Sequence, residues 1–301
     1  MAKYLNPFTD IGFKRIFGQE FSKPLLIDFL NNLLEGEKKI VELKFLDKEQ
    51  PAVYEGDRSL IYDIYCTTDK GENIIVEMQN REQPFFKKRS IYYIAESIAR
   101  QGEKGPEWRY SIKAVYLVAF LNFSLEDIGE KFRTDVALMD MQSKELFSQD
   151  MRLIYLQLPH FKKGAEECEN DFERWIYVLK NMETFNRLPW AAQNQVFQRL
   201  AEIADLGALT KEERMKYDEG LRKYRDTLCV MEGAVMKGRA EGRAEGRAEG
   251  RAEGKAEGTE LEKQATIQRL LAAEIDLSTI AIATGMTLQE VEEAAARLLE
   301  K

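Results

Sequence analysis

The sequence predicts an α/β protein in which a mixed β-sheet is flanked by helices. A helical region and a small C-terminal helical module follow the sheet. Ile, Val and Tyr alternate at period two along residues 60–79, as in β-strands. A helical segment then precedes the apolar run 112–121, and this order favours a parallel strand–helix–strand crossover. With 301 residues and 44% apolar residues, the chain can build one large domain plus smaller parts.

The elements before residue 163 follow from local signals. Phe13 and Phe17 are one helical turn apart, and Pro24 and Gly36 bracket a second apolar stripe at helical spacing. The run 112–121 is apolar throughout, as in a strand buried on both faces. The predicted order is helices over 6–18 and 22–36, strands over 40–46 and 60–68, a loop over 54–59, a strand over 72–79, a helix over 85–101, and strands over 112–121 and 153–158.

The stretch 60–79 predicts a β-hairpin that carries two acids. A three-residue loop that ends at Gly71, with this glycine in the left-handed conformation, places Asp63 directly opposite Glu77. Gln79 shares the face of Glu77 because successive side chains of a strand alternate. A two-residue loop would shift the register by one residue and put the two acids on opposite faces.

Two opposed carboxylates destabilise a sheet unless a cation or a proton neutralises them. Ile61, Tyr65 and Ile75 share the predicted face of Asp63 and Glu77, which indicates that the pair is covered. A hard divalent ion such as Mg²⁺, held by carboxylate oxygens, would meet this need. The alternative is that both acids lie on a solvated face of the sheet.

The helix predicted over 85–101 has two distinct faces. Arg89 and Tyr93 lie one turn apart on one face. Residues 81–113 carry eight Lys or Arg against four Glu, although the net charge of the chain is −8. This basic section is also explained by an ordinary solvated helix face. The inward face is predicted to carry Ile91, Ala95 and Ile98.

Several classes of protein are disfavoured. The three cysteines are scattered and odd in number, which argues against a disulfide scaffold or a zinc site. The single histidine, His160, makes catalysis by Ser-His or Cys-His pairs unexpected. Neither a signal peptide nor an apolar run of membrane-spanning length is visible, so we expect a cytoplasmic protein without a membrane partner.

Together these features resemble the PD-(D/E)XK nuclease superfamily, whose fold is of the restriction-endonuclease-like type. The resemblance spans roughly residues 4–260 and points to the recombination-promoting nucleases, which are also described as transposases. It rests on the element order, the segment 6–18, the spacing Asp63-x13-Glu77-x-Gln79, the pair Arg89-x3-Tyr93, and the glycine-rich charged repeat further on.

The resemblance implies Mg²⁺-dependent hydrolysis of DNA phosphodiester bonds. Asp63 and Glu77 would hold the metal, and Gln79 would complete the catalytic core at a position where the superfamily usually has Lys. An amide can orient a water molecule but cannot supply charge, so a cation from elsewhere is implied. The candidates for contact with DNA phosphates are Arg89, which can bind bidentately, Lys88, Lys14 and Tyr93. Asp57 and Glu20 are candidates for further acidic ligands, and each is also explained as a loop or surface acid.

Two other functions stay open. The chain can be a DNA-binding or oligomeric assembly protein on a nuclease-like scaffold with weak or no catalysis, which Gln79 and the acidic net charge favour. It can also be a sugar hydrolase, because opposed strand acids about 5 Å apart suit a retaining mechanism. No aromatic sugar platform is evident for the latter.

The remainder of the chain is predicted to be helical. In residues 238–258 glycine recurs at every fourth position within Gly-Arg-Ala-Glu units, and each glycine costs a helix about 0.5–1 kcal/mol relative to alanine. A flexible linker is therefore the preferred interpretation, and a long self-associating helix is the alternative. A homo-oligomer is expected. The predicted domains are 1–163 as the nuclease-like core, 164–236 as a helical bundle or arm, 237–259 as the repeat, and 260–301 as the C-terminal module.

The C-terminal module resembles a helix-turn-helix. Leu261 and Ile267 are predicted to belong to its core, and Thr287 is predicted to cap its last helix. The would-be recognition helix begins with acids, where a DNA reader needs basic or amide side chains. A protein-interaction bundle is therefore preferred to a DNA reader. The acids are Glu290, Glu292 and Glu293.

Overall fold

The computed structural model describes residues 2–50, 60–83, 85–105, 107–125 and 128–299. The chain divides into two compact units, Met1–Met231 and Glu232–Lys301. The loop predicted over 54–59 lies outside the described residues. None of the helices in the described ranges combines the length and the apolar character that a membrane span requires.

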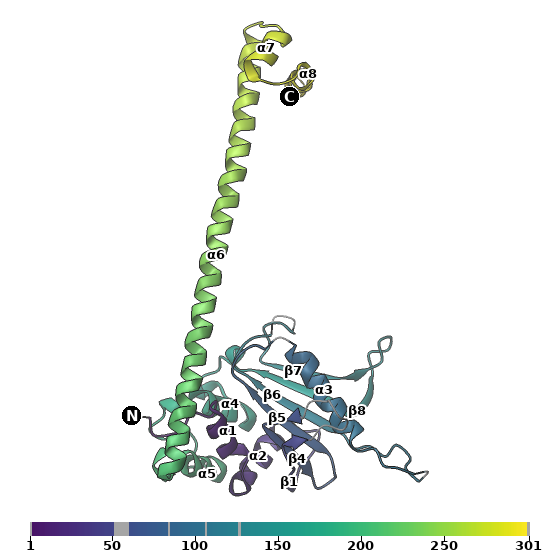
Figure 1. Ribbon diagram of the computed structural model, residues 1–301, viewed down its shortest axis with the longest axis vertical. Helices are drawn as coiled ribbons and strands as arrows, with labels where there is room; N and C mark the ends of the chain where they lie inside the picture. Colours follow the sequence, from purple (N-terminus) through teal and green to yellow (C-terminus); the bar gives the residue numbers. More distant parts are fainter. Residues whose placement is uncertain (1, 51–59, 84, 106, 126–127, 300–301) are drawn as a thin grey trace. The chain divides into compact units, whose positions relative to one another are not determined.

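A mixed six-stranded sheet organises the first unit (Figure 1). Strands β5, β6 and β8 are parallel, and the other three are antiparallel to their neighbours. The predicted parallel crossover through helix α3 (Phe86–Ala99) is confirmed. Across the sheet the strands are β1 (Leu43–Phe45), β4 (Ile64–Thr68), β5 (Asn73–Gln79), β6 (Val115–Leu121), β8 (Leu146–Gln157) and β7 (Arg133–Met139).

The predicted hairpin register is confirmed. Ile64 pairs with Val76, and Gly71 has φ +80°, as the three-residue loop requires. The strand predicted over 60–68 is wrong in one respect, because it breaks after Ile61. β3 (Leu60–Ile61) pairs with β2 (Glu49–Gln50) in a separate ribbon, so the Ile61 side chain is 61% exposed and does not cover the acids.

The predicted inward face of α3 is wrong for two of its three residues, whereas Ile98 packs against the core under the helix as predicted. Ile91 is 52% exposed and Ala95 is also exposed. The helix instead buries Phe86, Ser90, Ile94 and Ser97. The two serines lie against the sheet because their hydroxyls have partners there. Ser90 bonds the hydroxyl of Tyr155 at 2.6 Å, and Ser97 bonds that of Tyr65 at 3.0 Å.

Two strand predictions also need correction. The strand predicted over 40–46 shortens to β1, and the strand predicted over 153–158 extends back to Leu146. β7 was not predicted at all. It is the edge strand of the sheet and is largely exposed, so its sequence lacks the apolar alternation of a buried strand.

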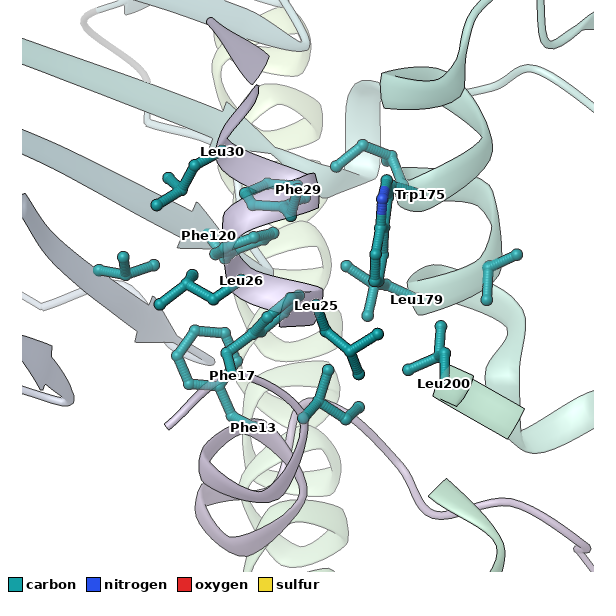
Figure 2. Packing of buried hydrophobic residues seen from close by; sticks show 14 of the residues in the cluster. Phe13, Phe17, Leu25, Leu26, Phe29, Leu30, Phe120, Trp175, Leu179 and Leu200 are labelled. Atoms are coloured by element: carbon teal, nitrogen blue, oxygen red, sulfur yellow. The ribbon is translucent and has the colours of Figure 1, made fainter. Parts of the chain in front are cut away.

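A large aromatic core covers the face of the sheet opposite α3. Phe17 and Phe29 meet Phe120 of β6 there, with Phe29 and Phe120 ring centroids 5.2 Å apart, and Trp175 packs against Phe29 (Figure 2). The two predicted N-terminal helices are confirmed, and the helical region after residue 164 contributes to the same core. The helices are α1 (Asp10–Phe17), α2 (Lys23–Leu33), α4 (Asp171–Asn181) and α5 (Gln195–Ala204). Short 3-10 helices occupy Glu20–Ser22, Leu158–His160, Ala165–Glu167, Met182–Thr184 and Leu206–Ala208.

The Gly-Arg-Ala-Glu repeat lies within helix α6 (Lys211–Ala272), so the preferred linker interpretation is wrong and the alternative of a long helix is confirmed, while its self-association stays a prediction. The predicted capping box at its start is present, with Glu213 N donating to Thr210 Oγ1 and Thr210 N donating to Glu213 Oε2. At each described glycine of the repeat, an added Cβ would meet no atom within 4 Å. This part of the helix therefore has no close tertiary packing around its glycines.

The C-terminal module forms as two short helices, α7 (Leu277–Thr284) and α8 (Leu288–Leu299), with the end of α6. Ile267, Ile280 and Val291 are fully buried in its small core. The predicted cap at Thr287 is confirmed. Leu261 was wrongly assigned to the core, because it is 66% exposed.

Candidate active site

Strand β5 directs two of the predicted site residues toward α3. Ile75, Glu77 and Gln79 share one face, as predicted, and all three are buried. In the parallel register Glu77 lies beside Ala119 of β6, which belongs to the core under α3. Asp63 comes one residue before β4, where the chain has left the two-stranded ribbon, and is half-buried.

Hydrogen bonds bring Asp63, Glu77 and Gln79 together. The Asp63 backbone N–H donates to Glu77 Oε1 at 3.4 Å, and the Met78 backbone N–H donates to Asp63 Oδ2 at 2.9 Å. Gln79 Nε2 donates to Glu77 Oε2 at 3.1 Å. Only 3% of Glu77 is exposed. The two acids therefore lie next to each other, and Glu77 is buried, so the alternative of a solvated sheet face does not hold for Glu77.

The electrostatics of this pair favour neutralisation. Burial, and then the charge of Asp63, raise the pKa of Glu77 to about 8. Burial also raises the pKa of Asp63, against the opposing effects of the Met78 N–H and of Lys14. Near neutral pH, and without a bound cation, Glu77 therefore keeps its proton.

Arg89 and Tyr93 border the acid pair from α3. The Arg89 charge lowers the pKa of both acids, and burial followed by the charge of Glu77 raises the pKa of Tyr93. The Arg89 guanidinium lies 5.1 Å from the ring centroid of Phe86 and 5.8 Å from that of Tyr93. Its Nη1 donates to Gln83 Oε1, and its buried Nε has no hydrogen-bond partner in the described part of the chain. Arg89 thus holds an unused donor beside the acids.

The other predicted residues lie in different places. Lys14 forms an ion pair with Asp10 on α1, and its charge opposes the rise in the pKa of Asp63. Lys88 is exposed, with Nζ 5.7 Å from the ring centroid of Phe85. Glu20 forms an exposed ion pair with Lys23, which identifies it as a surface acid. Asp57 lies outside the described residues.

Sequence reasoning missed Asp10 and Gln83. Asp10 raises the pKa of Asp63 from α1, and Gln83 anchors Arg89. The i,i+4 spacing of Asp10 and Lys14 was a usable signal for their ion pair, but nothing local to residues 6–18 indicates that this pair faces Asp63. A cavity of about 80 Å³ borders Asp63, with Gly18, Phe45 and Lys48 also in its wall.

The donor set fits a hard divalent cation. The described residues contain no group of three or more His, Cys, Asp or Glu side chains arranged for a metal ion. Asp63 and Glu77 nevertheless present two carboxylates, and Gln79 an amide, in a pair that needs neutralising charge. Mg²⁺ is often bound by one or two carboxylates while it keeps several waters, so these residues suit it.

The structure thus defines an α/β protein with a mixed sheet and a buried pair of carboxyl groups. The family model described as "PD-(D/E)XK nuclease family transposase" matches residues 7–234. This match covers more than half of the chain, and the protein belongs to that family. Comparison with curated proteins and with solved structures gave no match.

Proposed function

We propose that the protein is a Mg²⁺-dependent endonuclease that hydrolyses DNA phosphodiester bonds during recombination or transposition. The observation that carries this proposal is the buried pair of Asp63 and Glu77, in which the pKa of Glu77 is raised to about 8. Two adjacent buried carboxyl groups are costly to fold, because one must either stay protonated or ionise beside a like charge, so their presence needs a reason beyond stability. Binding a metal ion supplies that reason, and family membership supports it.

Asp63 and Glu77 would hold the metal ion. When bound there, Mg²⁺ would polarise the scissile phosphate and lower the pKa of a water molecule. The backbone N–H of Met78 fixes one oxygen of Asp63, and Gln79 fixes one oxygen of Glu77, so both carboxylates are oriented in advance. The Gln79 amide group would also orient a water molecule.

Arg89 would bind a phosphate oxygen of the DNA. Its ring contacts with Phe86 and Tyr93, and its bond to Gln83, limit its rotamers, and its charge acts on both acids. Arg89 would thus supply the positive charge that Gln79 cannot. Lys14 and Lys88 would add weaker contacts to the DNA backbone.

A second candidate function is DNA binding or assembly on this scaffold with weak or no catalysis. It is favoured by one observation, the neutral Gln79 at the position where the superfamily usually has a charged Lys. The two candidates share the DNA-binding surface and differ in whether the acid pair is needed for chemistry.

Nicking of supercoiled plasmid separates them. Wild type is expected to nick plasmid with Mg²⁺ and not with EDTA, and Asp63→Asn is expected to lose the activity while it still binds plasmid. The Asn side chain keeps the size of Asp63 and removes its charge. Plasmid binding without nicking by wild type in Mg²⁺ would support the second candidate, and nicking by Asp63→Asn at the wild-type rate would refute the proposed role of the pair.

A further inference from the structure

Phe85, the residue that precedes α3, has an unusual backbone and an exposed ring. Its φ is +69° and its ψ is +15°, a left-handed conformation that bulky side chains rarely adopt. Its side chain is 74% exposed. Such strain persists only where the neighbouring structure fixes it, and it concentrates at functional sites.

The residues after Phe85 hold it in place. The Phe85 carbonyl accepts a hydrogen bond from the Arg89 backbone N–H at 2.9 Å, in the first turn of α3. The next ring, Phe86, is buried, with its centroid 6.3 Å from that of Tyr155 on β8. Because Phe86 is anchored in the core, the left-handed conformation directs the neighbouring ring of Phe85 to the surface.

Basic and aromatic side chains follow Phe85 on the first two turns of α3. Lys88 lies above the Phe85 ring, and Tyr92, one turn beyond Lys88 on the helix, is 49% exposed. Arg89, in the same turn as Lys88, borders Asp63 and Glu77. An exposed aromatic ring among cations suits a polyanion with flat apolar groups, which describes a nucleic acid whose bases are unstacked.

We propose that Phe85 is a platform on which a DNA base stacks next to the scissile phosphate. This inference rests on the proposed function, because it takes the acid pair as the site of cleavage. The base must have left its own helical stack, so the preferred substrate would carry an unpaired or easily unstacked base beside the cut. Lys88 would contact the adjoining phosphate, and Phe85 would act as a specificity-determining residue.

The test uses a single-stranded oligonucleotide, the matching duplex, and the full-length protein in EDTA, so that cleavage plays no part in the readout. Wild type is expected to bind the single strand more tightly than the duplex, by fluorescence anisotropy. Phe85→Ala is expected to weaken single-strand binding about 5- to 100-fold, the range for loss of one stacked base. Phe85→Tyr is expected to keep wild-type affinity, whereas Phe85→Leu is expected to behave like Phe85→Ala.

Phe147→Ala is the matched control. Phe147 is 78% exposed and lies near the start of β8. The candidate site lies at the other end of the parallel strands, where β5 ends at Gln79. Removal of the Phe147 ring is expected to leave binding unchanged. Photocrosslinking with 5-iodouracil at successive positions is expected to give an adduct on Phe85 at one or two adjacent positions.

The outcomes separate this inference from the proposed function. Nicking in Mg²⁺ with equal binding by wild type and Phe85→Ala would overturn the stacking role and leave the nuclease intact. Position-specific crosslinking to Phe85 without any nicking would retain the stacking role and refute the nuclease. Equal loss of binding in Phe85→Ala and Phe147→Ala, or no binding of either oligonucleotide by wild type, would overturn the stacking role.

Discussion

Two carboxylate clusters on opposite faces of the same sheet show contrasting electrostatics. Asp135 on β7 receives bonds from Arg133 at 2.7 and 2.9 Å and from Arg152 at 2.8 Å. Burial alone would raise the pKa of Asp135, but these two arginines outweigh it and the pKa is lowered. The pair of Asp63 and Glu77 accepts bonds from backbone and amide N–H groups, and the pKa of both acids is raised.

The contrast distinguishes a structural carboxylate from one kept ready for a ligand. Asp135 is satisfied by the protein alone and links β7 to β8, so it needs no ligand. The pair of Asp63 and Glu77 is incomplete without a proton or a cation. Perturbed carboxylates of the second kind concentrate at functional sites.

The largest expected difference between the clusters is in cleavage. Glu77→Gln is expected to reduce Mg²⁺-dependent nicking about 10³-fold or more, because it removes a charge that holds the metal. Asp135→Asn is expected to stay within about twofold of wild type. Both rates are measured on supercoiled plasmid at pH 7.5, and equal losses in the two variants would remove the distinction between the clusters.

The next difference is in stability against pH without metal. The pKa of Glu77 rises from 4.5 in the unfolded chain to about 8 in the folded protein. Its contribution to the free energy of unfolding is therefore complete below pH 4.5 and is lost as the pH rises to about 8. The loss is on the order of 5 kcal/mol. Glu77→Gln is expected to abolish this pH dependence. At pH 9, Mg²⁺ is expected to stabilise wild type and not the Glu77→Gln variant. Denaturant titrations across this range would show the slope, and parallel curves for the two proteins would contradict the raised pKa.

A smaller difference in nicking rate is expected between lysine variants of two arginines. Arg89→Lys is expected to lower nicking about tenfold, because lysine cannot reproduce the planar donor group that the Phe86 and Tyr93 rings position. Arg152→Lys, the matched change beside Asp135, is expected to leave nicking unchanged. Single-turnover rates at saturating Mg²⁺ test both, and the assignment of the phosphate contact to Arg89 fails if its variant nicks at the wild-type rate.

The smallest effect is expected at Asp135. Asp135→Asn is expected to lower the free energy of unfolding by about 1 kcal/mol at pH 7, since the cluster is partly exposed to solvent. Because folding lowers the pKa of Asp135, its contribution to the free energy of unfolding is present above the unfolded pKa and is lost in acid. The difference from wild type should therefore shrink as the pH falls below the unfolded pKa, opposite in direction to the effect of Glu77. Urea denaturation at pH 7 and pH 2 measures it, and a constant difference would show that packing rather than charge is responsible.

The parts of the fold that local signals control were predictable. Gly71 and the alternation around it determine the hairpin register, and with it the approach of Asp63 to Glu77. The buried face of α3 was not predictable, because Ser90 and Ser97 become buried only when they find hydroxyls on the sheet. β7 escaped prediction because it is an exposed edge strand without the apolar alternation of a buried strand.

The site divides in the same way. Asp63, Glu77 and Gln79 belong to one hairpin and its approach, and Arg89 follows soon after, so the sequence sufficed to predict that these residues lie close together. Asp10 reaches the acids only through tertiary structure. The repeat was misjudged because its glycine cost was weighed in isolation. α6 is helical on both sides of the repeat, so no new nucleation is needed, and Ala, Arg and Glu are strong helix formers.

The four-residue period of the repeat has a geometric consequence. A helix rises about 1.5 Å and turns about 100° per residue, so one Gly-Arg-Ala-Glu unit lengthens it by about 6 Å and adds about 40° beyond a full turn. Within the unit Glu232–Lys301, one inserted repeat would therefore carry α7 and α8 forward and rotate them about the helix axis together. Nine inserted units would be needed to restore the original orientation, after about 54 Å of added length. Repeat number thus sets distance and angle at once.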